Sequence, residues 1–70
     1  MRKVYVATEG EMWEGYSILG VFESYKSAEA LIEKTIFAKG ETCVKEQGRP
    51  TWWNKDGIFY YQVSELEVKP

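Results

Sequence analysis

Residues 24–40 read SYKSAEALIEKTIFAKG and form the one segment of the sequence with a helical pattern. Residues that can pack in a core recur there every three or four positions, which places them on one stripe of a helix. The stripe consists of Ala28, Leu31, Ile32, Thr35 and Ile36. Ser24 is a favourable N-cap, because its hydroxyl can accept a free amide proton of the first turn. Gly40 can adopt the left-handed conformation that ends a helix, so we predict a single helix near residues 24–39.

Two strands are predicted before this helix. Residues 3–9 (KVYVATE) alternate in the manner of a strand, and residues 16–22 (YSILGVF) form a second strand. The loop at residues 10–15 is short, so the two strands should pair as an antiparallel hairpin. Gly20 within the second strand indicates a bulge or close packing, beneath the helix.

The segment after the helix is also predicted to be rich in strands. Residues 41–46 (ETCVKE) form a short strand, and residues 47–50 (QGRP) form a turn. A second hairpin follows, in which residues 51–53 are joined to residues 58–63 by Asn-Lys-Asp-Gly. The last residue of that connection, Gly57, can take a positive φ without strain.

The apolar pattern shifts by one position near the C-terminus. Tyr61 and Val63 are odd-numbered, whereas Leu66 and Val68 are even-numbered, which predicts a bulge near Ser64 and Glu65. The whole order is ββαββ or ββαβββ. We therefore predict an α+β fold in a single small domain, residues 1–70, with one helix packed on a mostly antiparallel sheet of four to five strands.

Composition narrows the class of protein. Seventy residues allow one core, and the formal net charge of −2 argues against strong binding to duplex nucleic acid, which needs a concentrated basic surface. With one Cys and no His, an internal disulfide is excluded and the usual zinc, copper or haem ligation is nearly excluded, so we predict no metal and no cofactor. No apolar run is long enough to span a bilayer and no signal peptide is evident, so the expected location is the cytoplasm.

Residues that could carry chemistry are few. Glu9, Glu11 and Glu14 could do acid–base work or hold a hard cation, but they lack a partner base and a metal-loop spacing, which favours a solvated loop. Cys43 would need a base to become a nucleophile, and the chain has no His. We therefore do not expect an enzyme.

The aromatic side chains of the second hairpin are the strongest candidates for a binding site. If residues 54–57 form the turn, Trp53 opposes Ile58 and Trp52 opposes Phe59. Trp52, Phe59, Tyr61 and Val63 then share one face of the sheet, which we assign to the helix. The other face carries Trp53, Ile58 and Tyr60, joined by Tyr5 from the first strand.

The sequence alone does not determine whether this second face is covered or exposed. The loop at residues 10–15, with Met12 and Trp13, could fold over it. Left uncovered, it could contact a protein, because Trp and Tyr are enriched at interfaces, or it could stack the bases of a single-stranded nucleic acid. The acidic charge balance favours a protein. The predicted binding residues are Trp53, Tyr60, Ile58, Tyr5 and Trp13.

The first half of the chain carries Val4-Tyr5-Val6, Gly20-Val21-Phe22, Ser24 and Ala28-Glu29 in that order. This pattern resembles a group of small uncharacterised bacteriophage and prophage proteins. The resemblance implies a phage or bacterial origin and a ββα start, and it implies no activity or ligand. Together these observations favour a phage-type accessory protein of the bacterial cytoplasm that occludes or modulates a host or phage protein, or pairs with itself as a homodimer. The alternative is a binder of single-stranded nucleic acid or nucleotide on the aromatic sheet face.

Overall fold

Helix α1 (Tyr25–Lys39) lies directly between Ser24 and Gly40, the two residues that were predicted to cap it. The Ser24 hydroxyl accepts a hydrogen bond from the Ser27 backbone N–H at 3.2 Å, which satisfies one free donor of the first turn. Gly40 has a φ of 67°, and its N–H donates to the Phe37 carbonyl. The predicted helix is confirmed.

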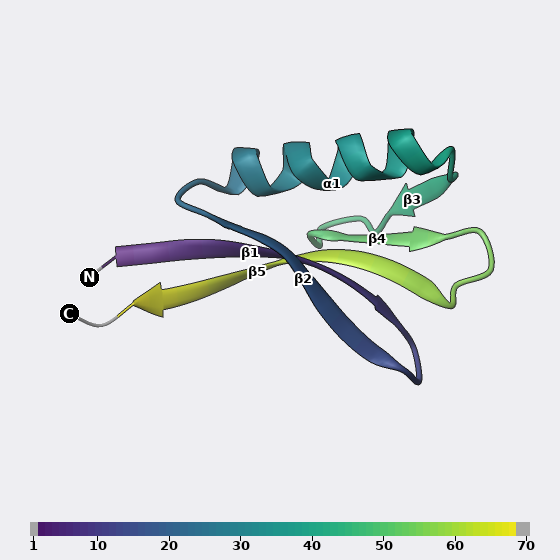
Figure 1. The fold of residues 1–70 in the computed structure, drawn as a ribbon, viewed down its shortest axis with the longest axis horizontal. Coiled ribbons are helices and arrows are strands. Elements are labelled where there is room, and N and C mark those ends of the chain that lie inside the picture. Colours follow the sequence, from purple (N-terminus) through teal and green to yellow (C-terminus); the bar gives the residue numbers. More distant parts are fainter. Residues whose placement is uncertain (1, 69–70) are drawn as a thin grey trace.

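The protein, seen in a computed structural model that describes residues 2–68, places this helix across one face of a five-stranded antiparallel sheet (Figure 1). The strands are β1 (Arg2–Glu11), β2 (Gly15–Phe22), β3 (Cys43–Lys45), β4 (Thr51–Asn54) and β5 (Phe59–Val68). With α1 between β2 and β3, the order is ββαβββ, and the predicted α+β class is confirmed.

The sheet order is β2-β1-β5-β4-β3, with every neighbouring pair antiparallel. The long strands β1 and β5 pair along their whole length at the centre of the sheet. Since β2 and β3 lie at opposite edges, the chain crosses the sheet through α1, and the helix therefore covers one face only (Figure 1).

The core lies between α1 and the sheet. The predicted helix stripe faces inward, with Ala28 and Ile32 fully buried and Leu31 and Ile36 partly buried against the same cluster. The buried sheet residues of this cluster are Ala7, Trp52, Tyr61 and Val63. Burial of these apolar side chains is the main term that stabilises the helix on the sheet.

Gly20 has both of the roles that the sequence suggested. The β1–β2 register shifts between Ala7, which pairs with Gly20, and Thr8, which pairs with Ile18, so Leu19 is the extra residue of a bulge. A Cβ atom at Gly20 would lie 3.2 Å from a Leu31 methyl group, which shows how closely α1 approaches β2 at this point.

Two predictions about β5 are wrong. Trp53 pairs with Tyr60 and Trp52 with Tyr61, so the hairpin register differs by two residues from the expected one. A slip of two keeps each side chain on its predicted face. The turn is longer than expected, because the Asn54 side-chain oxygen accepts the N–H groups of Ile58 and Phe59, which therefore do not enter the β4–β5 ladder.

The bulge expected near Ser64 and Glu65 is absent, since β5 pairs with β1 without interruption. The apolar pattern changes for another reason. The free ends of β1 and β5 extend past the start of α1 (Figure 1). Glu65, on the helix side of the sheet, is therefore charged, and its carboxylate forms an ion pair with the Lys3 ammonium group at 3.3 Å. Leu66 and Val68 lie on the opposite face.

Candidate functional site

The face of the sheet opposite α1 is the first candidate site. Cross-strand partners in an antiparallel sheet point to the same face, so the register defines its members. We call this surface the helix-free face. It consists of Arg2, Val4, Val6, Thr8 and Gly10 of β1, Tyr16, Ile18 and Val21 of β2, Tyr60, Gln62, Ser64, Leu66 and Val68 of β5, Thr51 and Trp53 of β4, and Val44 of β3.

The helix-free face exposes large apolar side chains. Tyr16, Ile18, Val21 and Leu66 expose 53–68% of their surface. The Trp53 and Tyr60 rings lie against each other with centroids 5.4 Å apart, and both residues are half-buried. The Tyr60 ring is held over Gly10, where a Cβ atom would come within 2.8 Å of it. Contiguous exposed apolar surface of this kind is typical of interaction sites.

A groove of about 380 Å³ runs along this face. Its floor is β1, where Val6 and Thr8 are buried, and Thr8 donates a hydrogen bond to the Gln62 carbonyl at 3.3 Å. Its walls are the taller side chains on either side, Tyr16 and Ile18 from β2 and Tyr60 and Leu66 from β5.

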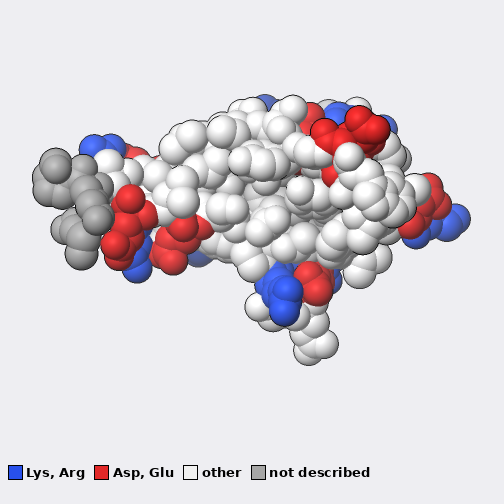
Figure 2. Space-filling view, turned by 90° about the horizontal axis from the view of Figure 1, so that it is seen from below, with Lys and Arg blue, Asp and Glu red and all other residues white. Residues whose placement is uncertain are grey.

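Charge is nearly absent from the helix-free face. Within residues 2–68, the register places one charged residue on it, Arg2 at the end of β1, which is ion-paired with Glu23. Figure 2 looks at this side of the molecule and shows a continuous uncharged surface, with Lys, Arg, Asp and Glu gathered toward its ends and margins. A surface of this composition favours apolar contacts over ionic ones.

The predicted site residues are only partly brought together. Trp53 and Tyr60 lie on the helix-free face and touch. Ile58 lies in the turn just before β5 and is partly exposed, and its carbonyl accepts a hydrogen bond from the Met12 N–H. Trp13 stands at the tip of the β1–β2 hairpin and is 81% exposed, so it does not bury itself against the aromatic residues.

The placement of Tyr5 on the exposed aromatic face is wrong. Tyr5 pairs with Phe22 and Glu65 on the helix side of the sheet. Its ring meets Tyr25 of α1 edge-on, with centroids 6.2 Å apart. The prediction failed because it fixed the faces within the second hairpin alone, without the register between β1 and β5.

Most residues of the helix-free face were not among the binding residues predicted from the sequence. Tyr16, Ile18 and Val21 come from β2, and Leu66 comes from the far half of β5. The alternation of Tyr16 and Ile18 with Ser17 was a usable signal. Val21 joins them only because the bulge at Leu19 shifts the alternation by one, and the sequence did not fix that position.

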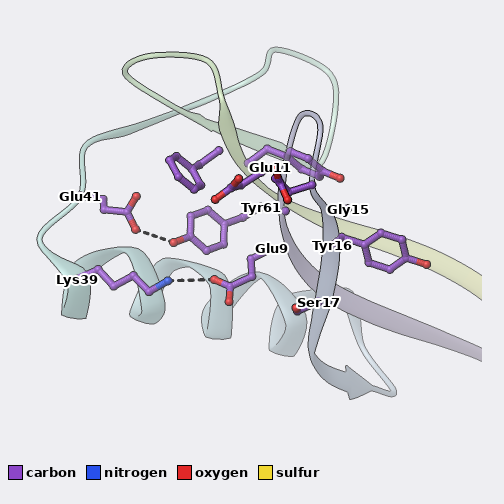
Figure 3. A pocket seen from close by; sticks show the side chains of 12 residues that line it. Glu9, Glu11, Gly15, Tyr16, Ser17, Lys39, Glu41 and Tyr61 are labelled. Carbon is purple, nitrogen blue, oxygen red and sulfur yellow. Dashed lines mark hydrogen bonds and ion pairs between the residues drawn. The ribbon is translucent and has the colours of Figure 1, made fainter.

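A second candidate is a pocket of about 480 Å³ between the end of α1 and the β1–β2 hairpin (Figure 3). Four carboxylates line it: Glu9, Glu11, Glu14 and Glu41. Lys39 donates to Glu9 at 3.0 Å and lies 5.7 Å from the centroid of the Tyr61 ring. The Tyr61 hydroxyl donates to Glu41 at 2.7 Å.

These contacts tie the end of the helix to the sheet. The pKa of Tyr61 is raised to about 12, mainly by burial and to a smaller extent by the hydrogen bond to the Glu41 carboxylate. The hydrogen bond to Glu9 raises the pKa of Lys39. Tyr61 therefore stays a proton donor and Lys39 stays charged at neutral pH, which are the states that these two bonds require.

The thiol of Cys43, in β3, is partly buried. Burial raises the pKa of the Cys43 thiol, which opposes the thiolate that a nucleophile needs. Residues 2–68 contain no group of three or more His, Cys, Asp or Glu side chains arranged to hold a metal ion. In the same part of the chain, no helix has the length and apolar character needed to cross a membrane.

Comparison with known proteins places the chain in a family. Neither the curated proteins nor the solved structures gave a match. A family model matches residues 2–70, which is nearly the whole sequence. The chain therefore belongs to the family described as a domain of unknown function, DUF7336.

Proposed function

We propose that this chain is a protein-binding module whose contact surface is the helix-free face and which carries out no chemistry of its own. The observation that supports the proposal most is the combination of exposed apolar side chains with the lack of charge. Tyr16, Ile18, Val21 and Leu66 stand more than half exposed on a face whose one charged residue among residues 2–68 is Arg2. Binding that removes such apolar area from water is favourable in free energy.

The same distribution of charge disfavours single-stranded nucleic acid as the ligand. Proteins that bind single strands combine stacking aromatic rings with a positively charged groove along the backbone. The groove on the helix-free face has Tyr16 and Tyr60 in its walls, but no Lys or Arg among its lining residues. A protein surface needs no such charge to bind there.

The class of partner follows from the sequence resemblance. If the chain has the phage or bacterial origin that the resemblance implies, it acts in the bacterial cytoplasm and its partner is a host or phage protein, or a second copy of the chain. Binding would then occlude or modulate the partner.

Capture from a bacterial lysate tests the proposal for a foreign partner. The immobilised chain is compared with the double variant Ile18→Ala and Leu66→Ala, which removes exposed apolar groups from both walls of the groove. Phe37→Ala is the matched control, because Phe37 is 87% exposed on α1, on the other side of the molecule. We expect proteins that the wild type and the control recover and the double variant loses. Equal recovery by all three folded proteins would exclude the helix-free face as the contact surface.

A further inference from the structure

We propose that the helix-free face is occupied by a second copy of this chain, so that two sheets pack face to face with both helices outermost. The inference rests on the proposed function, because it names the partner for the same surface. Such a dimer is isologous, since the same patch serves both copies. Two sheets of this kind pack about 10 Å apart with their strands rotated by about 30°, which is the arrangement of a β-sandwich.

The absence of charge is the first argument for a second copy. Like charges that meet across an interface cost several kcal/mol and are the usual means of excluding a wrong partner. Face-to-face packing of two copies brings no such pair together at the centre, because Arg2 at the end of β1 is the one charged residue of residues 2–68 on this face. The other charged residues visible in Figure 2 lie toward the margins of this face.

The shape of the face is the second argument. It combines a groove of about 380 Å³ over β1 with raised rows on both sides, Ile18 on one and Leu66 on the other. A two-fold axis that places one raised row in the groove of the partner also places the partner's row in the first groove. The face thus supplies both the projections and the recess that a self-complementary contact needs.

The size of the face is the third argument. The molecule measures 40 × 24 × 22 Å, and the helix-free face lies along its longest dimension (Figures 1 and 2). Stable interfaces bury about 800 Å² on each partner, so the dimer would use most of a face whose extents are 40 and 22 Å. A domain of this size buries a smaller share of its surface than a larger one does, so a second buried layer would add to a small core.

Analytical ultracentrifugation of the purified chain, from about 5 to 200 μM, tests the inference. We expect a species of twice the 8.1 kDa chain mass. Ile18→Glu, at an exposed position in the groove wall, should weaken the dimer at least about 30-fold, the effect of losing one strong interface residue. Phe37→Glu adds the same charge on the outer side of α1 and should leave the dimer unchanged. Circular dichroism checks that each variant is folded, and Leu66→Glu replaces Ile18→Glu if the latter unfolds.

Two results would overturn the inference. One is a wild-type chain that stays monomeric at 200 μM, and the other is a dimer that a folded Ile18→Glu variant, or the folded Leu66→Glu variant that replaces it, leaves intact. A monomer that still captures a lysate protein in an Ile18- and Leu66-dependent manner would reject the homodimer alone and leave the protein-binding function standing. A wild-type chain that neither self-associates at 200 μM nor captures a lysate protein in an Ile18- and Leu66-dependent manner would reject the two together.

Discussion

Ile32 is the largest fully buried side chain within residues 2–68, and it lies at the centre of the contact between α1 and the sheet. Ile32→Ala removes buried methyl groups and leaves a cavity, so we expect a loss of about 2–5 kcal/mol in the free energy of unfolding. Urea denaturation measures it. Lys34→Ala, at an exposed position of the same helix, is the control. A loss below about 0.5 kcal/mol for Ile32→Ala, as at surface sites, would place Ile32 outside the core.

Tyr61 predicts how stability depends on alkaline pH. Its pKa is raised from the ordinary value of 10 to about 12, so the folded state favours the protonated phenol more than the unfolded state does. The resulting stability is fully present below pH 10 and is lost as the pH rises toward 12. Tyr61→Phe removes the hydrogen bond to Glu41, and we expect about 1–3 kcal/mol less stability at pH 7 and a shallower decline between pH 10 and 12.

Urea melts at pH 8, 10 and 11 would measure this decline. Tyr25 and Lys39 also have raised pKa values, so both proteins lose some stability in alkali and the difference between them is the informative quantity. Tyr16→Phe, at an exposed tyrosine, serves as the control for the substitution itself. Parallel pH curves for the wild type and Tyr61→Phe would contradict the prediction.

Single residues with a local role were the most predictable from the sequence. Ser24 and Gly40 act within one turn of the chain, and their neighbours along the sequence determine that role. Tyr5 was placed on the wrong face because its position depends on Glu65, sixty residues away, through the β1–β5 pairing. No local pattern contains that register.

The β4–β5 hairpin is the element whose connection the sequence indicated best. Gly57 has a φ of 71°, as predicted, and a Cβ atom there would meet nothing within 4 Å. Any cost of substitution therefore comes from the backbone. We expect Gly57→Val to cost roughly 1–3 kcal/mol, because a β-branched residue is strained at positive φ. Gly57→Asn should cost less in the same urea melts, since Asn tolerates this conformation. Equal costs for both would point away from backbone strain.

The way in which the elements pair with one another was harder to predict than the elements themselves. The turn signal fixed the position of the hairpin, but the two hydrogen bonds accepted by the Asn54 side chain lengthened the turn and moved the register by two. The change of apolar parity before Leu66 was a real signal with the wrong interpretation. It marks the point where α1 no longer covers the sheet, which depends on where the helix starts relative to β5 (Figure 1).

The helix-free face is a property of the whole molecule. It joins side chains from five strands, and only the order β2-β1-β5-β4-β3 brings Ile18 and Leu66 to the two walls of one groove. The sequence indicated that one helix could not cover both faces. It did not indicate that the charged residues of the central strands would all fall on the helix side except Arg2, because that separation depends on the pairing of β1 with β5.

This separation of charge predicts how the whole molecule behaves toward nucleic acid. Backbone contacts to six or more phosphates make affinity fall by about 10³-fold or more between 50 and 200 mM salt, and even non-specific binding reaches dissociation constants of about 10⁻⁴–10⁻⁶ M. With no Lys or Arg lining the groove, we expect no saturable binding of a fluorescein-labelled 20-nucleotide oligothymidine at 50 mM NaCl, up to about 100 μM protein. Fluorescence anisotropy measures it. Saturable, salt-sensitive binding that Ile18→Glu abolishes would show that the helix-free face binds single strands, and would favour nucleic acid over protein as its ligand.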